Sequence, residues 1–444
     1  MNSKSSWSRR SMSQRIEKRV SARSSRSVKR SFRGADMQGS ITERADGLPL
    51  AGAKVVDLSR LLPGPWCSQT LGDLGADVIK IEQPDIGDYG RFNPPYYREG
   101  GVYFNSVNRN KRSITLDLKL EADSRIALDL MRDADIVVES YRAGVTTKLG
   151  IDYAAISKIN PGVIYCSVTG FGTDGPFALV PGHDLSIQGA TGILDVGPHE
   201  GAPAMPGFQA ADYAGATYAT IAVLAAYIQR LKTGRGRHLD IALYDSLMVL
   251  SNIALTGAMA RAAGHSGKPE LEVWGNNPRY ATYPTKDGKA VTVCLLEMRT
   301  WEQFCKLIGR TDLIYKETYA DRHTSHGERA DVFRDVIGQL CIAHDRDELV
   351  ARMVEADIPI CPIYSPDEAL ASAEARGRTL IRMADHPTEG PIPQIFDPLT
   401  RAGLADPLRR MAPGLGEHND EIRRELSLNK AGAATLQSSS TAKR

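Results

Sequence analysis

The sequence predicts a doubly wound α/β fold, in which helices cover both faces of a parallel sheet. The first observation is a strand, a helix and a strand in quick succession, at 54–58, 67–74 and 77–81. Such short crossover units join parallel strands. The second observation is that the pattern repeats, with strands at 113–117, 136–139 and 163–169 and helices at 121–132 and 152–159. Sheets of this type bind ligands beyond the carboxyl ends of their strands.

The second half of the chain opens on an Ala-rich segment, 214–231, that is apolar on nearly every face and predicts a buried helix. A strand at 238–243 and a helix at 245–261 complete the large domain. A smaller α+β domain is expected next, beginning with a hairpin over 280–296 that turns at Asp287-Gly288. Helices of this second domain are expected at 300–309, 328–342, 346–355 and 367–375.

Composition shifts divide the chain into five expected parts. They are a basic Ser/Arg-rich leader (1–45), a large Rossmann-like domain (46–262), a smaller α+β domain (263–375), a return segment to the large domain (376–427) and a polar tail (428–444). The leader and the tail are expected to be disordered because both are polar and poor in large apolar residues.

The 444 residues are 42% hydrophobic and 24% charged, which is typical of a soluble globular protein. No apolar run is long enough and free enough of charge to span a bilayer. The six cysteines are scattered, and none has the spacing of a metal site. We therefore expect a cytoplasmic protein with no metal, no membrane contact and no disulfide framework.

The basic leader points to a second possible location. Residues 1–36 carry a net charge of +9, so the rest of the chain is near −7. A Ser/Arg-rich, acid-poor segment without a hydrophobic stretch resembles an organelle transit peptide, which makes a mitochondrial or other organelle location the alternative. A disordered tail or a start at Met37 would also fit. Because no aromatic residues are interleaved with the cations, we do not expect a nucleic-acid partner.

A glycine pattern at 170–175 matches G-x-G-x-x-G directly after a strand. In dinucleotide-binding folds a helix must follow, so that its first amides meet the pyrophosphate. Pro176 and Pro181 follow instead. We therefore predict a turn-rich loop rather than a dinucleotide site.

Three features carry candidate chemistry. Asp212 lies where the Ala-rich helix would begin, so it is either an N-cap or a functional carboxylate. Arg109, Lys111 and Arg112 precede a strand and are either a solvated loop or a phosphate site. The stretch 139–144 lies at the carboxyl end of another strand, where ligands bind.

These stretches, taken together, resemble the family III CoA-transferases, whose superfamily includes the α-methylacyl-CoA racemases. The matching pieces keep their order from about residue 50 to 425, at 64–69, 74–82, 108–119, 139–144, 169–176, 232–236 and 415–418. The resemblance implies a Rossmann-like large domain, a smaller domain, an interlocked homodimer and CoA bound at the large domain. Its partners would be acyl-CoA and a small carboxylic acid, with no tightly bound cofactor besides CoA as part of the substrate.

The resemblance also assigns roles to residues. Asp212 would attack the thioester and become a mixed acyl anhydride, with the helix-start amides steadying the oxyanion. Besides Arg109, Lys111 and Arg112, CoA contacts would come from Ser140, Tyr141 and Lys148. The position of a family Arg near the adenosine phosphate is Gln83, which lacks that charge.

Two residues depart from the plain transferase pattern. His183 matches a racemase His where transferases more often carry Tyr, and Glu297 matches a racemase acid that would orient it. In a 2-methylacyl-CoA racemase, His183 and Asp212 would exchange the α-proton as an acid/base pair. The alternative is that neither residue is catalytic. His183 is then only a turn residue, and Glu297 lies in the loop before a capping box at Thr300. We favour CoA transfer, because 187–192 and 108–119 look more like transferases. An inactive CoA-binding scaffold is the third reading.

Overall fold

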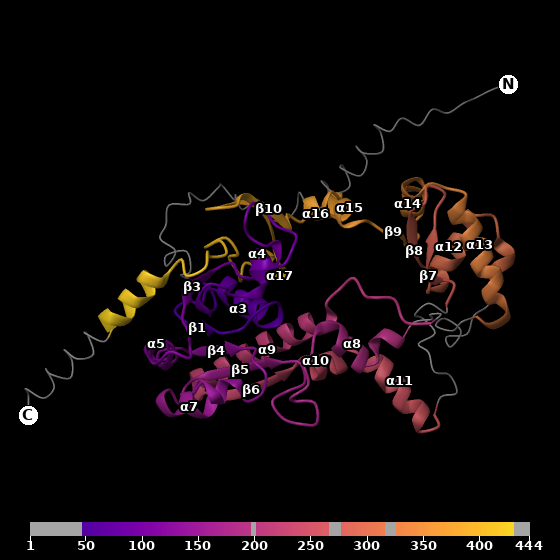
Figure 1. Cartoon of the computed structure of the whole chain (residues 1–444). Helices are drawn as coiled ribbons and strands as arrows, with labels where there is room; N and C mark the ends of the chain where they lie inside the picture. The colour runs from indigo at the N-terminus through magenta and orange to yellow at the C-terminus, as the bar shows by residue number, and fades with distance from the viewer. Residues whose placement is uncertain (1–46, 197–200, 266–276, 316–325, 430–444) are drawn as a thin grey trace, which may run out of the picture. The chain divides into compact units, whose positions relative to one another are not determined.

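The structure, a computed structural model, describes residues 47–196, 201–265, 277–315 and 326–429. Its large domain is built on a six-stranded parallel sheet with the order β3-β2-β1-β4-β5-β6 (Figure 1). The strands are β1 (Lys54–Asp57), β2 (Asp77–Glu82), β3 (Lys111–Thr115), β4 (Ile136–Glu139), β5 (Ile164–Thr169) and β6 (Arg237–Ala242). The predicted doubly wound fold is therefore confirmed, and the strand order reverses between β1 and β4.

Helices cover both faces of this sheet, as its alternating buried side chains require. Val55 and Val78 pack toward α3, α9 and α10 on one face. Val56 and Val137 pack toward α5, α7 and the final helix at 419–429 on the other. The helices of this domain are α3 (Pro63–Asp73), α4 (Val102–Val107), α5 (Glu121–Arg132), α6 (Val145–Lys148), α7 (Tyr153–Ile159), α8 (Asp184–Ala190), α9 (Ala210–Thr233), α10 (Leu243–Leu250) and α11 (Asn252–Ala262), with 3-10 turns η1 (Tyr89–Phe92) and η2 (Ile193–Asp195).

The smaller α+β domain has its own hydrophobic core around Trp301, Phe304 and Phe333. It contains an antiparallel sheet in the order β7-β8-β9, with the predicted hairpin as its first two strands. Its elements are β7 (Tyr280–Pro284), β8 (Ala290–Cys294), β9 (Ile360–Pro362), α12 (Met298–Leu307), α13 (Ala330–Ile342), α14 (Arg346–Glu355), η3 (Thr311–Leu313) and η5 (Gly327–Arg329).

The C-terminal segment returns to the large domain by backbone hydrogen bonds. Asp406 donates to the carbonyl of Asp73 over 2.8 Å, and His418 donates to that of Ser113 over 3.0 Å. Before this segment come α15 (Pro366–Leu370), whose Glu368 pairs with Arg346 of the smaller domain, and α16 (Ala373–Gly377). The elements of the return segment are β10 (Ile381–His386), β11 (Gly390–Ile395) and α17 (Pro398–Arg401). β10 and β11 form an antiparallel hairpin within the predicted return segment (376–427).

Two predicted helices are each broken in two. The helix expected over 245–261 divides at Ser251 into α10 and α11, which are bent by 75° relative to each other. The helix expected over 367–375 divides at Ser372, whose hydroxyl accepts the amide of Ala375 and so starts α16. Such a cap favours serine at the start of a helix, but the Ser251 hydroxyl makes no such bond, so packing rather than capping sets the break between α10 and α11.

Within the described residues, no single helix has the length and apolar character needed to cross a bilayer; α10 and α11 meet that criterion only as a bent pair. The predicted leader, residues 266–276 near the start of the predicted smaller domain and the tail from 430 lie outside the described residues. The G-x-G-x-x-G stretch is an irregular loop that ends where α8 begins, as predicted. Gly172 and Gly175 hold φ values of 88° and 85° there, which favour glycine.

Candidate active site

Asp212 lies in the first turn of α9, but it is not the N-cap. The helix begins at Ala210 and its N-cap residue is Gln209, so Asp212 is the third helical residue. The N-cap interpretation is therefore wrong by position. The helix starts four residues before the apolar segment that begins at 214, because Asp212 and Tyr213 interrupt the apolar pattern without interrupting the helix.

Asp184, in the first turn of α8, receives the amides at the start of α9. Its Oδ1 accepts from the backbone N of Ala211 over 2.8 Å and of Asp212 over 3.2 Å. Its Oδ2 accepts from Nε2 of Gln188 over 2.6 Å. These two helix-start amides are thus already engaged by a carboxylate, and their predicted role in steadying an oxyanion stays a prediction that would require Asp184 to release them. The sequence singled out His183 as a candidate but gave no signal for its neighbour Asp184.

The second carboxylate changes the protonation of the first. Burial, together with repulsion from Asp184, raises the pKa of Asp212 to about 7. Within the part of the chain that the structure describes, no hydrogen bond holds the Asp212 side chain. Asp212 is therefore half-buried, unbonded and close to half-ionised near neutral pH, which suits a carboxylate that must react.

Aromatic side chains surround the beginning of α9. The ring of Tyr213 stacks on Phe208 at 5.2 Å and meets the edge of Trp66 at 5.9 Å between centroids. Burial raises the pKa of the Tyr103 phenol, and the nearby charge of Asp212 adds to this. Tyr103 comes from α4 and was not singled out in the sequence. These rings make the surroundings of Asp212 apolar, which strengthens any charge interaction there.

The two racemase-type residues have different surroundings. His183 is exposed and directly precedes α8, so it adjoins Asp184 and through it the start of α9. Its backbone N donates to the hydroxyl of Ser186 over 2.9 Å. Glu297 is exposed at the N-cap position of α12 in the smaller domain, and this helix begins at Met298, two residues before the predicted start. Its role in orienting His183 stays a prediction.

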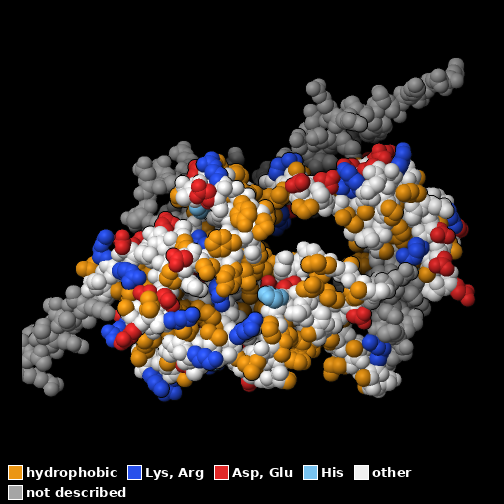
Figure 2. Space-filling view, viewed as in Figure 1, with side chains coloured by type: hydrophobic (Ala, Val, Ile, Leu, Met, Phe, Trp, Pro, Cys, Tyr) orange, Lys and Arg blue, Asp and Glu red, His pale blue; other side chains and the backbone are white. Residues whose placement is uncertain are grey.

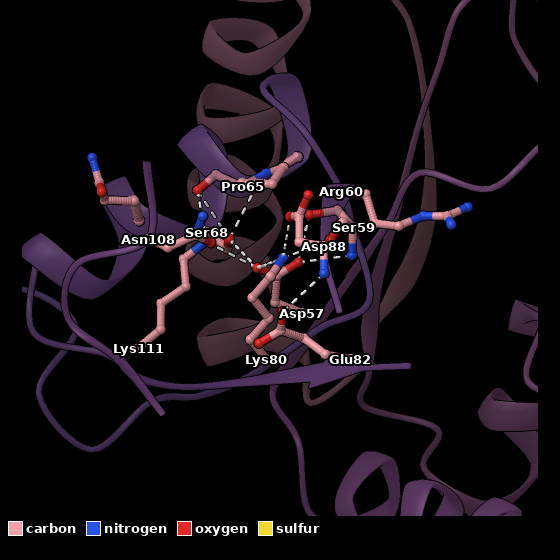
Figure 3. Close-up of polar contacts among 12 residues, drawn as sticks. Asp57, Ser59, Arg60, Pro65, Ser68, Lys80, Glu82, Asp88, Asn108 and Lys111 are labelled. Carbon is pink, nitrogen blue, oxygen red and sulfur yellow. Dashed lines mark hydrogen bonds and ion pairs between the residues drawn. The ribbon is translucent and has the colours of Figure 1, made fainter. Parts of the chain in front are cut away.

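A buried charge network joins Asp57, at the carboxyl end of β1, to Lys80 within β2 and to Lys111 at the start of β3. Figure 3 shows Lys80 and Lys111 converging on Asp57, with Nζ to Oδ2 distances of 3.7 and 3.0 Å. Ser68 donates to the same oxygen over 2.7 Å, and Lys80 also pairs with Asp88 at 3.0 Å. The two lysines hold the pKa of Asp57 well below its usual range, although burial alone would raise it. The network ties three strands together.

The three cations predicted to hold phosphate are all engaged by carboxylates. Arg109 pairs with Asp73 at 2.7 Å. Lys111 belongs to the Asp57 network. Arg112 pairs with three acids, Asp77, Glu421 and Glu425. Each cation is almost fully buried, so the structure gives all three a role in joining segments of the chain. Phosphate binding by them stays a prediction that would require these ion pairs to open.

The other predicted CoA contacts lie at the carboxyl end of β4 and just beyond it. Tyr141 donates its backbone N to Oε2 of Glu139 over 2.7 Å. The hydroxyl of Ser140 accepts the backbone N of Arg60, and Lys148 is exposed at the end of α6. Arg60, which follows β1, was missed by sequence reasoning although it occupies a strand end. Among the described residues, no group of three His, Cys, Asp or Glu side chains is arranged to hold a metal ion.

Fold and site define an α/β protein whose candidate reactive group is a carboxylate. The chain belongs to CoA-transferase family III, whose model matches residues 50–419. It is 31% identical to the succinate–glutarate CoA-transferase of Agrobacterium fabrum, over 85% of this chain and 96% of that one. It is 30% identical to the acetyl-CoA:oxalate CoA-transferase of Acetobacter aceti, over 86% and 97%. A CaiB/BaiF family protein from Brucella suis has the same fold, with 34% identity, a TM-score of 0.73 and coverage of 85% and 99%.

Proposed function

We propose that this protein transfers CoA between an acyl-CoA thioester and a small carboxylic acid, with Asp212 as the covalent carboxylate. Asp212 attacks the thioester carbonyl, which gives an aspartyl–acyl anhydride and the CoA thiolate. The thiolate then attacks the aspartyl carbonyl, which releases the first acid and leaves an aspartyl–CoA thioester. The acceptor carboxylate attacks that thioester to form a second anhydride. The thiolate then attacks the acceptor's acyl carbon and frees Asp212.

The observation that carries this proposal is the environment of Asp212 in a chain of this family. A carboxylate with a pKa near 7 is a stronger nucleophile, once ionised, than one with an ordinary pKa. The absence of hydrogen bonds to its side chain, within the described residues, leaves its oxygens open to a substrate. Relatives that share about 30% of the sequence are named as transferases acting on dicarboxylic acids, which supports a small carboxylic acid as acceptor.

Hydroxylamine trapping tests the covalent step. Incubation of the full chain with an acyl-CoA and hydroxylamine should convert Asp212 to a hydroxamate, detectable by peptide mass spectrometry. The variant Asp212→Asn should show neither the modification nor transfer of CoA from succinyl-CoA to glutarate. Turnover in the wild type with no mass change at Asp212 would remove the anhydride mechanism.

Racemisation is the second candidate, because His183 adjoins the carboxylate that contacts Asp212's own amide. It requires removal of the α-proton of a 2-methylacyl thioester by one residue and its return by the other. In heavy water, a racemase would incorporate deuterium at the α-carbon without any acceptor acid. Retention of the α-proton across 2-methylacyl-CoA substrates would leave transfer as the function.

We also propose that the protein works as a homodimer. Large apolar side chains are exposed on the last helices of the large domain, and Figure 2 shows hydrophobic surface in the region of α10 and α11. They are Ile221, Ile228 and Leu231 on α9, Val249 and Leu250 on α10, and Ile253 and Met259 on α11. A group of large apolar side chains exposed on neighbouring helices usually marks a contact with another protein surface.

A further inference from the structure

Arg60 occupies the place in this fold where ligands of doubly wound sheets bind. It follows β1 by three residues, and β1 and β4 are the neighbouring strands between which the strand order reverses. The backbone N of Arg60 donates to the hydroxyl of Ser140, at the end of β4, over 3.0 Å. Arg60 therefore bridges the two strand ends at the switch point, where the crevice for a ligand opens.

The backbone on both sides of Arg60 is fixed by buried acids. Ser59 donates its backbone N to Oδ1 of Asp57 over 2.8 Å. Leu61 donates its backbone N to Oδ1 of Asp88 over 3.0 Å and holds a φ of 65°. A left-handed conformation is unfavourable for leucine and persists only where its surroundings impose it. As a result the Arg60 side chain extends away from the charge network, as Figure 3 shows.

Two tyrosine rings hold the guanidinium without neutralising it. The Cζ atom of Arg60 lies 4.9 Å from the ring centre of Tyr89 and 5.3 Å from that of Tyr141. Both distances are within the range of a cation–π interaction. Across the described part of the chain, no carboxylate forms an ion pair with Arg60. Its positive charge is thus oriented, half-buried and uncompensated.

The cations on β2 and β3 and in the segments beside them differ from Arg60. Arg91 pairs with Glu82 at 2.7 Å, and Arg109 and Arg112 have carboxylate partners of their own. Lys80 and Lys111 are fully buried against Asp57. A polyanion reaching the switch point would therefore meet a guanidinium that needs to break no ion pair first. The planar fork of arginine can donate two parallel hydrogen bonds to a phosphate.

We propose that Arg60 binds the diphosphate of coenzyme A, and that the rings of Tyr89 and Tyr141 keep its guanidinium in position for this. The inference rests on the proposed function, in which acyl-CoA is the substrate. It identifies a substrate-binding residue, whereas Asp212 carries the reaction. The second carboxylate of a dicarboxylic acyl group is the other oxyanion that would pair with a free arginine, and the experiment separates the two.

Isothermal titration of the full-length protein with CoA and with pantetheine tests the proposal. Pantetheine keeps the thiol arm but lacks every phosphate. Arg60→Gln should weaken CoA binding about ten- to a hundredfold, the usual loss for a charge-assisted contact, and should leave pantetheine binding unchanged. Arg60→Lys, which keeps the charge but not the fork, should fall between. Arg237→Gln removes an exposed arginine at the amino end of β6, an edge strand separated from β1 by β4 and β5, and should bind CoA as the wild type does.

Inorganic pyrophosphate gives a second readout that a merely structural role would not change. It should compete with CoA for the wild type, and Arg60→Gln should bind it no better than background. Unchanged CoA binding by Arg60→Gln overturns the inference. So does a variant that binds CoA normally but loses only its preference for succinate over butyrate. A wild type that binds no CoA would instead refute the proposed function.

Discussion

At the scale of single residues, the pair Asp184 and Asp212 leads to a pH prediction. Attack on a thioester requires ionised Asp212, so kcat/KM should rise as the pH passes through about 7. Asp184→Asn removes the neighbouring negative charge but keeps an oxygen that can accept the two amides. The acid limb of the pH profile should then move to lower pH by about one unit, because only burial still raises the pKa of Asp212.

The measurement is the rate of CoA transfer from succinyl-CoA to glutarate between pH 5 and 9, for the wild type and the variant. Gln188→Ala is a suitable control, since it removes a partner of Asp184 while leaving its charge in place. An acid limb that stays at the wild-type position in Asp184→Asn would show that repulsion between the two carboxylates does not set the pKa.

The buried network at Asp57 gives a prediction about stability. Asp57→Asn would leave the ammonium groups of Lys80 and Lys111 buried with too little negative charge, since Asp88 pairs with Lys80 alone. Removing one partner of a buried ion pair costs about 3–5 kcal/mol. Urea denaturation should show a loss of this size at pH 7, whereas Arg125→Gln, which breaks an exposed pair with Glu121, should cost less than about 1 kcal/mol.

The same variant should respond to pH in a defined direction. In the wild type, burial lowers the pKa of Lys111 to about 8 although Asp57 opposes this. Without Asp57 the pKa falls further, so the folded variant binds fewer protons than its unfolded chain between neutral and alkaline pH. The two folded forms then differ in bound protons only below the wild-type pKa of about 8, so the deficit of Asp57→Asn should shrink as the pH rises from 6 to about 8 and level off above it. A deficit that stays constant over this range would contradict the assignment.

Candidate functional residues could be singled out from the sequence only where a motif contained them. Asp212, Ser140 and Tyr141 stand in recognisable stretches, and the structure places all three in the large domain. Asp184 and Arg60 were missed because their importance depends on partners far along the chain, such as the amide of Asp212 and the ring of Tyr141. Arg109 and Arg112 look like phosphate ligands in the sequence, yet distant acids engage both of them.

At the scale of elements, the pairing of β5 with β6 depends on a close approach at Gly236. A Cβ at this position would lie 1.9 Å from the carbonyl oxygen of Val163, which is backbone and cannot turn aside. Gly236→Ala should therefore push β6 from the sheet edge and destabilise the protein by several kcal/mol, at the upper end of the range for point mutants.

Thermal or urea unfolding measures this loss, with Gly257→Ala as the control. Gly257 lies within α11 and has open space at its Cβ position, so alanine should be neutral or stabilise by up to about 1 kcal/mol. Equal stability of Gly236→Ala and the wild type would mean that β6 is not held as closely to β5 as the structure has it.

Elements were easier to predict from the sequence than the breaks between them. The bounds of α5 and β4 agree with the expected ranges, because periodicity and composition change sharply at their ends. α10 and α11 look like one helix in the sequence, since the apolar pattern continues across Ser251. The 75° bend is set by packing, which a one-dimensional pattern does not contain.

At the scale of the whole molecule, the exposed apolar faces of α9 to α11 predict the state of assembly. Ile253 and Met259 are 67% and 70% exposed. Several large apolar side chains exposed on neighbouring helices are unusual in a monomeric protein. Light scattering after size-exclusion chromatography should give the wild type the mass of two chains. The double variant Ile253→Glu/Met259→Glu should elute with the mass of one chain, because burying two carboxylates in an apolar interface costs more than the interface gains. Leu120→Glu, at the N-cap of α5, is an equally exposed control that should stay dimeric. A wild type with the mass of a single chain would remove the dimer proposal. A dimer that survives both glutamates would place its interface elsewhere on the molecule.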